Sequence, residues 1–476
     1  METQTLIESA GIDSHVATLA RLLGPSTVLT STGALAAGAD PRAVLVDVLS
    51  QPNERAVWLV LAVLQGEPPT SDDVVRWRRR IELEGATHVL AVLSRGSGQK
   101  VRIIHGGVVV DAHHTLATTL STGIQRVVRN VLSRWHATQK YSLVAWDRKF
   151  ERIHLMPPGS HAGARVSAPV DLVSVVPWEC TYILPELAVE AHRLERIQAV
   201  AEFSASRSAV IGFDTVPMTS AETCGPGMPG AFARNLAALT HFDRIAAISD
   251  ASAAEYEGWR TMIHSAGLLG PEILSIGLPL VAIPTSAKVI DPRKTLGLDG
   301  RPIVMCLGSH EPRKNHPAVL HAAELLWREG LEFQVVFCGG NGWGSEGFEH
   351  RVGELRSGGR KVSTHTRVPD ATLSALMREA RFSIFPSLSE GYGLPVAESL
   401  ASGTPVITSN YGSMAGIASH GGALVVNPRD DSDIADAMRK LLQDDELVER
   451  LAAEAAAVPT TTWEAYADEL WSFFVN

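Results

Sequence analysis

The sequence has few of the features that mark several common classes of protein. It contains only four cysteines in 476 residues, far apart and in no CxxC or zinc-ligand spacing. Neither a disulfide framework nor a structural zinc site is therefore predicted, and a reducing compartment is indicated. The formal net charge of −10 argues against a broad nucleic-acid-binding surface, which is usually basic. We expect no nucleic-acid partner.

Long apolar segments are also missing. No run of about 18 apolar residues that could cross a bilayer is present. Residues 1–11 lack the basic start and the apolar stretch of a signal peptide. We expect a cytoplasmic protein, and leave open peripheral contact at the inner face of the membrane and assembly into a homo-oligomer. Neither a Walker loop nor a serine nucleophile elbow occurs.

What is present indicates several α/β domains. Residues 1–100 carry helix-period patterns, which predict a small helical accessory module. From residue 101 onward, short β-rich runs alternate with helical segments in two series, which is typical of two doubly wound parallel sheets. We expect one such domain at 101–290, a second at 291–457, and a C-terminal helix within 458–476. Ligands of such sheets bind beyond the carboxyl ends of the strands.

The strand candidates fall into these two series. Those of the first series are residues 108–111, 142–147, 170–176, 209–214 and 245–249, and those of the second are 303–307, 333–338, 362–365, 382–385, 406–409 and 423–426.

The most informative segment, FPSLSEGYGLPVAE, joins a buried strand to a helix through a loop with two glycines. Proline is favoured in a first helical turn, so the helix should begin near Leu394. Gly391 and Gly393 let the backbone approach a ligand, and the free N–H groups of the helix start suit a phosphate or sugar hydroxyls. Glu390 and Glu398 could hold hydroxyl groups by charge-assisted hydrogen bonds. Two solvated glutamates on a plain strand–turn–helix are the alternative.

A second segment, GSHEPRKN, follows the strand candidate 303–307. Arg313 and Lys314 stand next to each other at the carboxyl end of that strand, in an otherwise acidic protein. Arginine offers a planar fork of donors and lysine a mobile point charge, so the pair indicates an anion site. An exposed basic turn is the alternative interpretation.

Together the two segments resemble glycosyltransferase family four, a large family of retaining enzymes with the GT-B fold. The family's signature is a pair of glutamates with seven residues between them, here Glu390 and Glu398 within PSLSEGYGLPVAESLASGTPVITS. The resemblance covers roughly residues 101–476. It implies two Rossmann-like domains that face a cleft.

The resemblance also implies roles for single residues. Arg313 and Lys314 would bind the donor diphosphate, Glu398 the ribose hydroxyls, and Val368 the base through its backbone. The donor-binding residues that it implies are Gly308, Arg313, Lys314, Val368, Glu390, Gly391, Tyr392, Gly393, Leu394 and Glu398, and the catalytic set is Arg313, Lys314, Glu390 and Asp214.

The acceptor side is marked less clearly. Thr122 and Gln125 have the spacing of a capping box, and we place Gly123, at this helix start, near the donor phosphate or the acceptor. Asp214 is a candidate contact to the acceptor or sugar; many family members carry His-Asp here, and this chain has Phe213 in place of the histidine. The neighbouring His113 and His114 (in the loop 113–120) are interpreted as a solvated loop pair, with ligand or acceptor contacts as the alternative.

The expected activity is transfer of a hexose from a nucleotide sugar to a glycan or a lipid-linked saccharide, with retention of configuration. The form EPRKN resembles the mannosyltransferase branch, so GDP-mannose is the first candidate donor. We expect no cofactor and no catalytic metal, because the DxD-like Asp431–Ser432–Asp433 precedes a helical pattern and is interpreted as a helix cap. A GT-B sugar-nucleotide epimerase or hydrolase, and a non-catalytic glycan-binding protein, remain alternatives.

Overall fold

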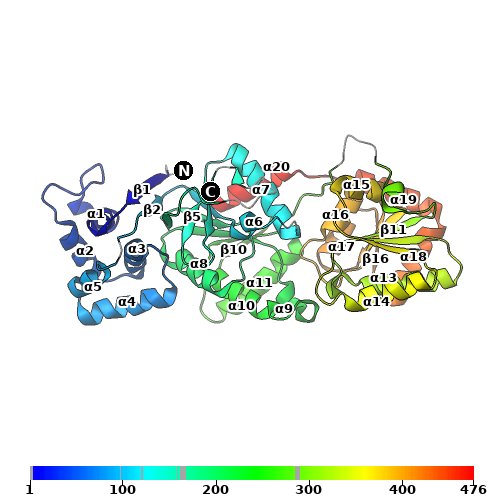
Figure 1. The fold of residues 1–476 in the computed structure, drawn as a ribbon, viewed down its shortest axis with the longest axis horizontal. Helices are drawn as coiled ribbons and strands as arrows, with labels where there is room; N and C mark the ends of the chain where they lie inside the picture. The colour runs from blue at the N-terminus through cyan, green and yellow to red at the C-terminus, as the bar shows by residue number, and fades with distance from the viewer. Residues whose placement is uncertain (1–3, 97, 120–121, 158, 161–167, 285–289) are drawn as a thin grey trace.

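The computed structural model describes residues 4–96, 98–119, 122–157, 159–160, 168–284 and 290–476. The molecule is elongated, and three α/β parts follow one another along its length, as Figure 1 shows from blue to red. None of the helices in the described part of the chain combines the length and the apolar character that a bilayer span requires.

The first part is mainly helical, with one strand. Its elements are β1 (Thr5–Ser9), α1 (Ile12–Leu23), the 3-10 turn η1 (Ser26–Val28), α2 (Pro41–Ser50), α3 (Glu54–Gln65), α4 (Ser71–Glu84) and α5 (Ala86–Leu93). Almost all of α3 is buried, and the other helices surround it. The expected helical module thus also contains β1, which pairs antiparallel with a strand beyond residue 100.

The middle part contains the acceptor-side sheet. Its elements are β2 (Val101–His105), β3 (Val108–Asp111), α6 (His113–Ala117), α7 (Gly123–Thr138), β4 (Ser142–Trp146), β5 (Ile153–Leu155), β6 (Ser174–Trp178), β7 (Thr181–Leu184), α8 (Ala191–Phe203), β8 (Arg207–Gly212), α9 (Val216–Thr219), the 3-10 turn η3 (Ala221–Thr223), α10 (Met228–Leu239), β9 (Arg244–Ala247), α11 (Asp250–His264) and β10 (Glu272–Ser275). Leu120 and Ser121, at the end of the expected loop and just before the expected helix cap, lie outside the described residues.

The strands of the middle part form a sheet in the order β10-β9-β8-β7-β3-β4-β5, and only β5 runs antiparallel to its neighbour. One expectation was wrong: the strand predicted at 170–176 begins at Ser174 and belongs to another sheet, β1-β2-β6. Trp178 at its end stacks on Trp58 of α3, with ring centroids 6.4 Å apart. This small sheet and its stacked tryptophans join the first part to the second.

The third part is the donor-side domain. Its elements are α12 (Pro292–Leu296), β11 (Ile303–Leu307), the 3-10 turn η4 (Pro312–Lys314), α13 (His316–Arg328), β12 (Gln334–Cys338), α14 (Glu346–Ser357), β13 (Val362–His365), α15 (Asp370–Glu379), β14 (Phe382–Phe385), α16 (Leu394–Ala401), β15 (Val406–Ser409), α17 (Gly412–Ala418), β16 (Ala423–Val426), α18 (Asp431–Gln443) and α19 (Asp445–Ala457). All strands of its sheet are parallel, in the order β13-β12-β11-β14-β15-β16. The last helix of the chain, α20 (Trp463–Val475), follows this domain.

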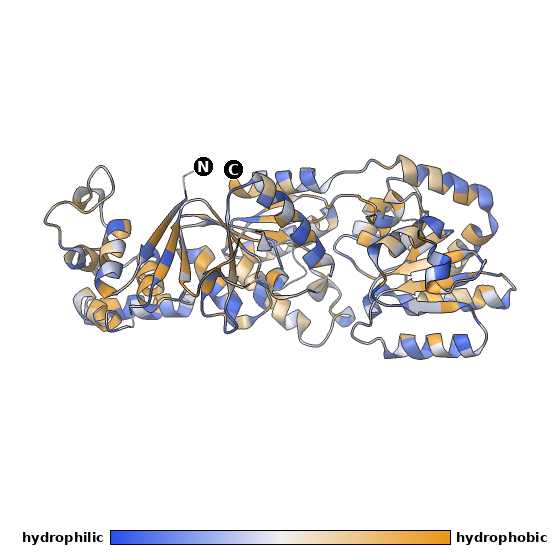
Figure 2. Cartoon of the chain, turned by 45° about the horizontal axis from the view of Figure 1, so that its top comes forward, coloured by the Kyte–Doolittle hydropathy of each residue, from blue (hydrophilic) through white to orange (hydrophobic). Residues whose placement is uncertain are grey.

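Buried apolar side chains on both faces of the two large sheets hold the layers together. In Figure 2 the strands of both sheets are mostly orange, and the helices that cover them have blue outer surfaces. Such two-sided burial is what parallel strands with helical crossovers require. On the donor sheet, α13, α14 and α18 pack against one face, and α15 and α16 lie against the other.

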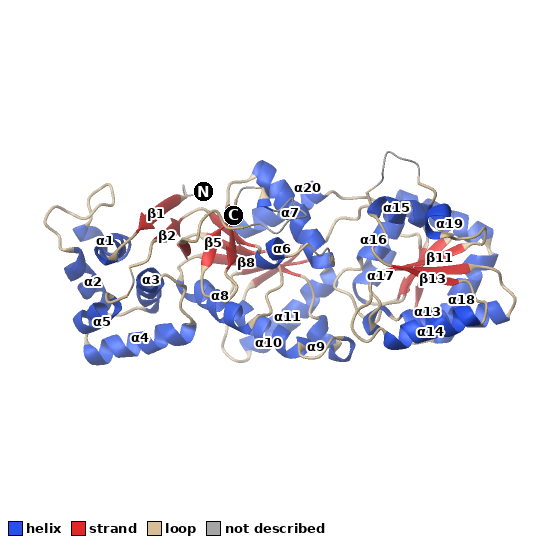
Figure 3. Cartoon of the chain, viewed as in Figure 1, coloured by secondary structure: helices blue, strands red, loops and turns tan. Residues whose placement is uncertain are grey.

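The last helix, α20, returns to the middle part. There it lies beside α7, as Figures 1 and 3 show. The indole N–H of Trp135 donates a hydrogen bond of 2.8 Å to the backbone oxygen of Ala467, and the ring of Trp135 meets that of Trp471 edge-on at 5.3 Å. Chain connectivity and an aromatic contact therefore both tie the two domains together.

Candidate active site

The candidate site begins where two adjacent strands of the donor sheet end. β11 and β14 pair in parallel, so the loop after β11 and the turn after β14 lie at the same edge. The backbone N–H of Leu388 donates a hydrogen bond of 2.8 Å to the carbonyl oxygen of Arg313, and this bond fixes the two loops to each other. Sequence alone could place each loop at a strand end; their mutual contact is a consequence of strand order.

Three of the predicted residues meet at this edge. The carboxylate of Glu390 accepts from Arg313 Nη1 at 2.5 Å and from Lys314 Nζ at 2.6 Å. Arg313 also donates a hydrogen bond of 3.0 Å to the backbone oxygen of Ser389. The ammonium of Lys314 lies 4.9 Å from the ring centroid of Phe385. Neither cation is an exposed turn residue, since their side chains are 19 % and 10 % exposed.

The charge state of Glu390 follows from these neighbours. Burial alone would raise the pKa of this carboxyl, but the charges of Arg313 and Lys314 outweigh it and lower the pKa to about 2. Glu390 is therefore ionised at every physiological pH. It holds both cations in place at the carboxyl end of the sheet, where an anion could be bound.

The helix start next to this cluster has the predicted form. Gly393 has φ 104°, a conformation that favours glycine, and α16 begins at Leu394 with proline in its first turn. Leu394 also faces the acceptor-side domain, because a Cβ on Gly123 would lie 3.7 Å from Leu394 Cδ1. Gly123 begins α7, whose capping box is present: Gln125 Oε1 accepts from the backbone N–H of Thr122 at 3.2 Å. Two helix starts therefore adjoin at this point.

Gly391 differs from the expectation. A Cβ at this position would lie 2.5 Å from the backbone oxygen of Phe213 and 2.7 Å from Cβ of Asp214. The space beside Gly391 is thus filled by the strand-end loop of the other domain, and glycine is needed for close domain contact. The structure thus gives a reason for glycine at this position that the sequence did not indicate, and the approach of a ligand to Gly391 stays a prediction.

Hydrogen bonds continue this contact between the domains. Ser249 Oγ and Ser252 Oγ donate to the backbone oxygen of Gly391 at 2.6 and 3.0 Å. Tyr392 donates its hydroxyl to the backbone oxygen of Leu278 at 2.7 Å. We call the set Gly391, Tyr392, Ser249, Ser252 and Leu278 the seam. Ser249 also caps α11, since its Oγ accepts a hydrogen bond from the backbone N–H of Ser252 at 3.0 Å.

Asp214 lies beside the cation cluster. Its carboxylate accepts from the backbone N–H of Val216 at 3.1 Å. Burial raises the pKa of Asp214 above its usual value, and the nearby charge of Arg313 offsets only part of that rise. Phe213, which stands where many family members have histidine, is buried in the sheet core. The structure therefore brings Asp214, Arg313 and Glu390 into one electrostatic neighbourhood.

Glu398, the predicted contact to the ribose hydroxyls, lies one turn inside α16. Its side chain is only 4 % exposed, and Arg126 Nη2, from α7 of the other domain, lies 2.5 Å from its Oε1. Asp370, at the start of α15, is close enough to raise the pKa of Glu398 by charge repulsion. The side chain of Val368 packs against the domain core just before α15. Arg126 is a residue that the sequence reasoning missed.

Gly308 occupies the predicted phosphate loop. It has φ 138°, and a Cβ on it would lie 3.7 Å from Lys314 Cε. The backbone of this loop thus runs alongside the lysine side chain, within the cation cluster.

Two further sequence hypotheses have clear outcomes. His113 and His114 are not a solvated loop pair: they begin the short helix α6, His113 Nδ1 accepts from Trp146 N at 3.2 Å, and His114 Nε2 lies 2.8 Å from Glu190. The acidic run at Asp431 is a helix start, as predicted, although the capping side chain is that of Asp430.

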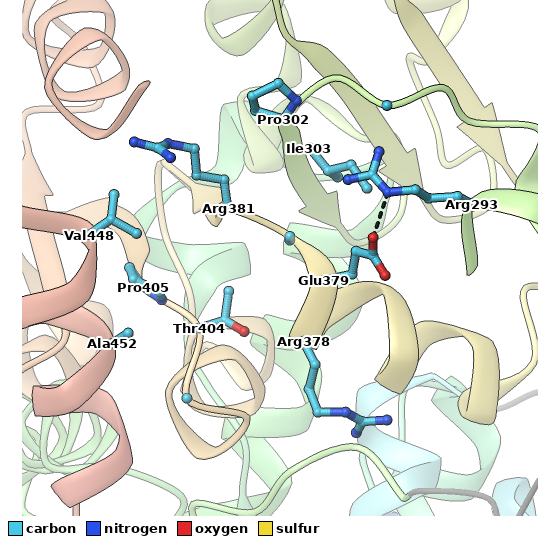
Figure 4. Close-up of a pocket in the computed structure, with 13 residues that line it drawn as sticks. Arg293, Pro302, Ile303, Arg378, Glu379, Arg381, Thr404, Pro405, Val448 and Ala452 are labelled. Atoms are coloured by element: carbon cyan, nitrogen blue, oxygen red, sulfur yellow. Dashed lines mark hydrogen bonds and ion pairs between the residues drawn. The ribbon is translucent and has the colours of Figure 1, made fainter. Parts of the chain in front are cut away.

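A hollow of the donor domain lies at the other end of its sheet. Figure 4 shows Pro302 and Ile303, Arg381, and Thr404 and Pro405 around it. These residues precede or begin β11, β14 and β15, so the hollow of about 420 Å³ lies at the amino ends of the strands. In doubly wound sheets ligands bind beyond the carboxyl ends, and this hollow has no part in the candidate site.

The comparison with protein families agrees with this geometry. Residues 290–458 match the family model described as "Glycosyl transferases group 1". The donor side is thus a group 1 glycosyltransferase domain, and the resemblance to glycosyltransferase family four is confirmed.

Curated relatives have similar names. The chain is 26 % identical over 304 residues to the serotype-specific mannosyltransferase WbdA of Escherichia coli, a match that takes in 60 % of this chain and 36 % of that protein. It is 33 % identical over 161 residues to the O-antigen chain mannosyltransferase B of Escherichia coli, covering 33 % of this chain and 42 % of that one. The chain thus spans well under half the length of these relatives.

Among solved structures, the sucrose-phosphate synthase from Thermosynechococcus elongatus is similar with a TM-score of 0.57 at 16 % identity. The match covers 78 % of this chain and 98 % of that one. At this identity the likeness shows the fold, which is GT-B, as predicted.

Proposed function

We propose that the protein is a retaining hexosyltransferase that uses a nucleotide sugar, with GDP-mannose as the first candidate donor and a glycan or lipid-linked saccharide as acceptor. The mannosyltransferase names of the relatives support the choice of mannose. The proposal rests on one observation: Arg313 and Lys314 converge on Glu390 beside the start of α16.

This arrangement suits a diphosphate. The lysine ammonium has three donors and the guanidinium five, and the contacts to Glu390, Glu311 and the Ser389 carbonyl occupy only part of them. The start of α16 adds free N–H groups and a positive dipole end. A diphosphate placed between the cations and the helix start would accept hydrogen bonds from both sides.

The same groups would stabilise the reaction. Breaking the anomeric bond builds positive charge on the sugar ring and negative charge on the departing diphosphate. Fixed donors aimed at developing charge are usually the largest single contribution to catalysis. Arg313 and Lys314 would supply the positive charge that a metal ion supplies elsewhere, so we propose that transfer needs no metal.

The acceptor would approach from the side of Asp214. In a retaining transfer without a protein nucleophile, the acceptor hydroxyl attacks the face that the diphosphate leaves, and a diphosphate oxygen takes its proton. Asp214, close to Arg313 and Glu390, could then orient the hydroxyl or the sugar.

A panel of nucleotide sugars tests the proposal. Donors that bind the folded state should raise the melting temperature, with GDP-mannose giving the largest shift among GDP, UDP and dTDP sugars. The best donor is then incubated with oligosaccharide and lipid-linked acceptors, and the products are examined by mass spectrometry and by NMR of the anomeric proton. An α-linked product from an α-linked donor supports retention. Free sugar or an epimer without acceptor would indicate hydrolysis or epimerisation, and contradict transfer.

A further inference from the structure

Beside the seam, one further ion pair joins the two domains. Arg126 lies on α7 and Glu398 on α16, 272 positions apart in the chain, with 2.5 Å between Nη2 and Oε1. Each residue stands one turn inside its helix, behind the two helix starts at Gly123 and Leu394 that adjoin each other. The pair therefore links the domains directly behind the proposed diphosphate position.

The two partners lie in different surroundings. The side chain of Glu398 is 4 % exposed, whereas that of Arg126 is 42 % exposed. A buried carboxylate without a partner tends to become protonated, because burial disfavours its charged form. The other charged group that faces Glu398 is Asp370, which also disfavours ionisation. Arg126 is thus the partner that favours the ionised carboxylate of Glu398.

The pair leaves hydrogen-bonding capacity on the carboxylate. The hydrogen bond from Arg126 goes to Oε1, and in the described part of the chain no hydrogen bond is made to the second oxygen, Oε2. A carboxylate with one oxygen held by a guanidinium and the other unoccupied is oriented to accept hydrogen bonds from a vicinal diol. Ribose carries such a diol at its 2′ and 3′ positions.

We propose that Arg126 of the acceptor-side domain is a positioning residue for the donor nucleoside: it orients Glu398 and keeps it ionised, so that Oε2 accepts the ribose hydroxyls. This role rests on the proposed nucleotide-sugar function. It makes nucleoside binding depend on the domains being closed at the seam, because the orienting residue belongs to the opposite domain. An open arrangement would lose the Arg126 contact and with it the preference of Glu398 for the ribose.

Removal of the arginine should change the pH dependence of nucleotide binding. The pKa of Glu398 is already raised by burial, and Arg126 counteracts the rise. In Arg126→Ala this counteraction is lost, so Glu398 becomes protonated at a higher pH than in wild type. As the pH falls, the GDP affinity of this variant should therefore begin to decline at a higher pH. An opposite charge typically lowers a carboxyl pKa by about 1–3 units, so we expect the midpoint of the decline to move up by about one unit or more.

The test is calorimetric titration with GDP and UDP from about pH 5.5 to about pH 8.5, a range that spans a raised carboxyl pKa. Arg126→Lys retains the charge and should restore most of the wild-type profile. Arg134→Ala is the matched control, since Arg134 lies on the same helix α7 and pairs with Glu464 at 3.1 Å; its profile should equal that of the wild type. Glu398→Gln should bind GDP more weakly, with a pH profile that Arg126→Ala no longer shifts.

The outcomes separate the two proposals. If wild type binds neither nucleotide, the proposed function fails and this inference fails with it. If wild type binds GDP or UDP and Arg126→Ala follows the same pH profile, only the positioning role is overturned. A uniform loss of affinity in Arg126→Ala at all pH values, unchanged by Arg126→Lys, would likewise contradict it, because packing would then explain the contact.

Discussion

Both Rossmann-like domains bury an arginine among carboxylates at the carboxyl ends of their strands, and the two clusters differ in what surrounds them. On the acceptor side, Arg193 lies 3.0 Å from Asp111 and 2.9 Å from Glu186, and all three side chains are at most 1 % exposed. On the donor side, Arg313 and Glu390 are 19 % and 9 % exposed.

The two carboxylates of the acceptor-side cluster accept further hydrogen bonds from the protein. Tyr182 and Trp146 each donate a hydrogen bond of 2.6 Å to Asp111 Oδ2. Glu186 accepts from the backbone N–H groups of His114 and Thr115 at 2.7 and 2.9 Å, and so fixes the short helix α6. This cluster holds a loop in place and is sealed from solvent, whereas the cations of the donor-side cluster, which borders the seam, are partly exposed. Burial, more than residue type, separates the structural cluster from the candidate site.

The largest expected effect is loss of stability when the acceptor-side cluster is broken. Arg193→Met leaves Asp111 and Glu186 buried without their cation, which costs about 3–5 kcal/mol of unfolding free energy for such a pair. Denaturant unfolding measures it. The exposed pair of Arg76 and Asp73 provides the control, since Arg76→Met should change stability by less than about 1 kcal/mol. Equal effects of the two variants would remove the distinction drawn above.

The donor-side cluster predicts a particular pH dependence. The pKa of Glu390 is lowered from 4.5 to about 2, so its charged form stabilises the fold above about pH 4.5, and this stabilisation is lost as the pH falls toward 2. The pH-dependent difference in the free energy of unfolding between wild type and Glu390→Gln is on the order of 3 kcal/mol in favour of wild type. It should be constant from about pH 8 to about pH 5 and should shrink below that. A decline already between neutrality and about pH 5 would show that the cations do not control this carboxyl.

Activity should depend on the same cations. Arg313→Ala and Lys314→Ala should each lower the rate of transfer by more than about tenfold, because each removes a fixed donor from the departing diphosphate. Steady-state rates at saturating acceptor measure this. Arg328→Ala, on the exposed end of α13 and paired with Glu324, is the control for loss of a positive charge. Wild-type turnover in both site variants would refute their phosphate role.

A smaller effect is expected at the ribose. Glu398→Ala should weaken donor binding by several fold, since one charge-assisted contact of about 1–2 kcal/mol is lost. Calorimetry with the nucleoside diphosphate measures the affinity. Unchanged affinity would remove Glu398 from the nucleoside.

The fold was predictable where the sequence signals were local. β11, β13, β14, β15 and β16 have the predicted bounds, because a parallel strand buried on both faces is a short apolar run between turn residues. The strand predicted at 170–176 begins only at Ser174, because its pairing with β2 is set by partners far away in the chain. β1, with most of its side chains exposed, carries no alternation strong enough to be recognised.

The candidate site was likewise predictable only where the sequence signals were local. Residues on two donor-side loops could be named from their motifs, and strand order brings Arg313, Lys314 and Glu390 together. Contacts between the two domains could not be predicted from the sequence, because nothing near Arg126 indicates that its partner stands 272 positions away. The tight fit of Gly391 against Asp214 likewise depends on how two domains dock.

The central claim is that one diphosphate is bound between the cations and the start of α16, and comparison of GDP with guanosine tests it most directly. Calorimetric titration should show that wild type binds GDP far more tightly than guanosine, and that Arg313→Ala and Lys314→Ala abolish most of that difference while leaving guanosine binding unchanged. Equal affinity of wild type for GDP and guanosine, or a GDP preference that survives in both variants, would contradict it.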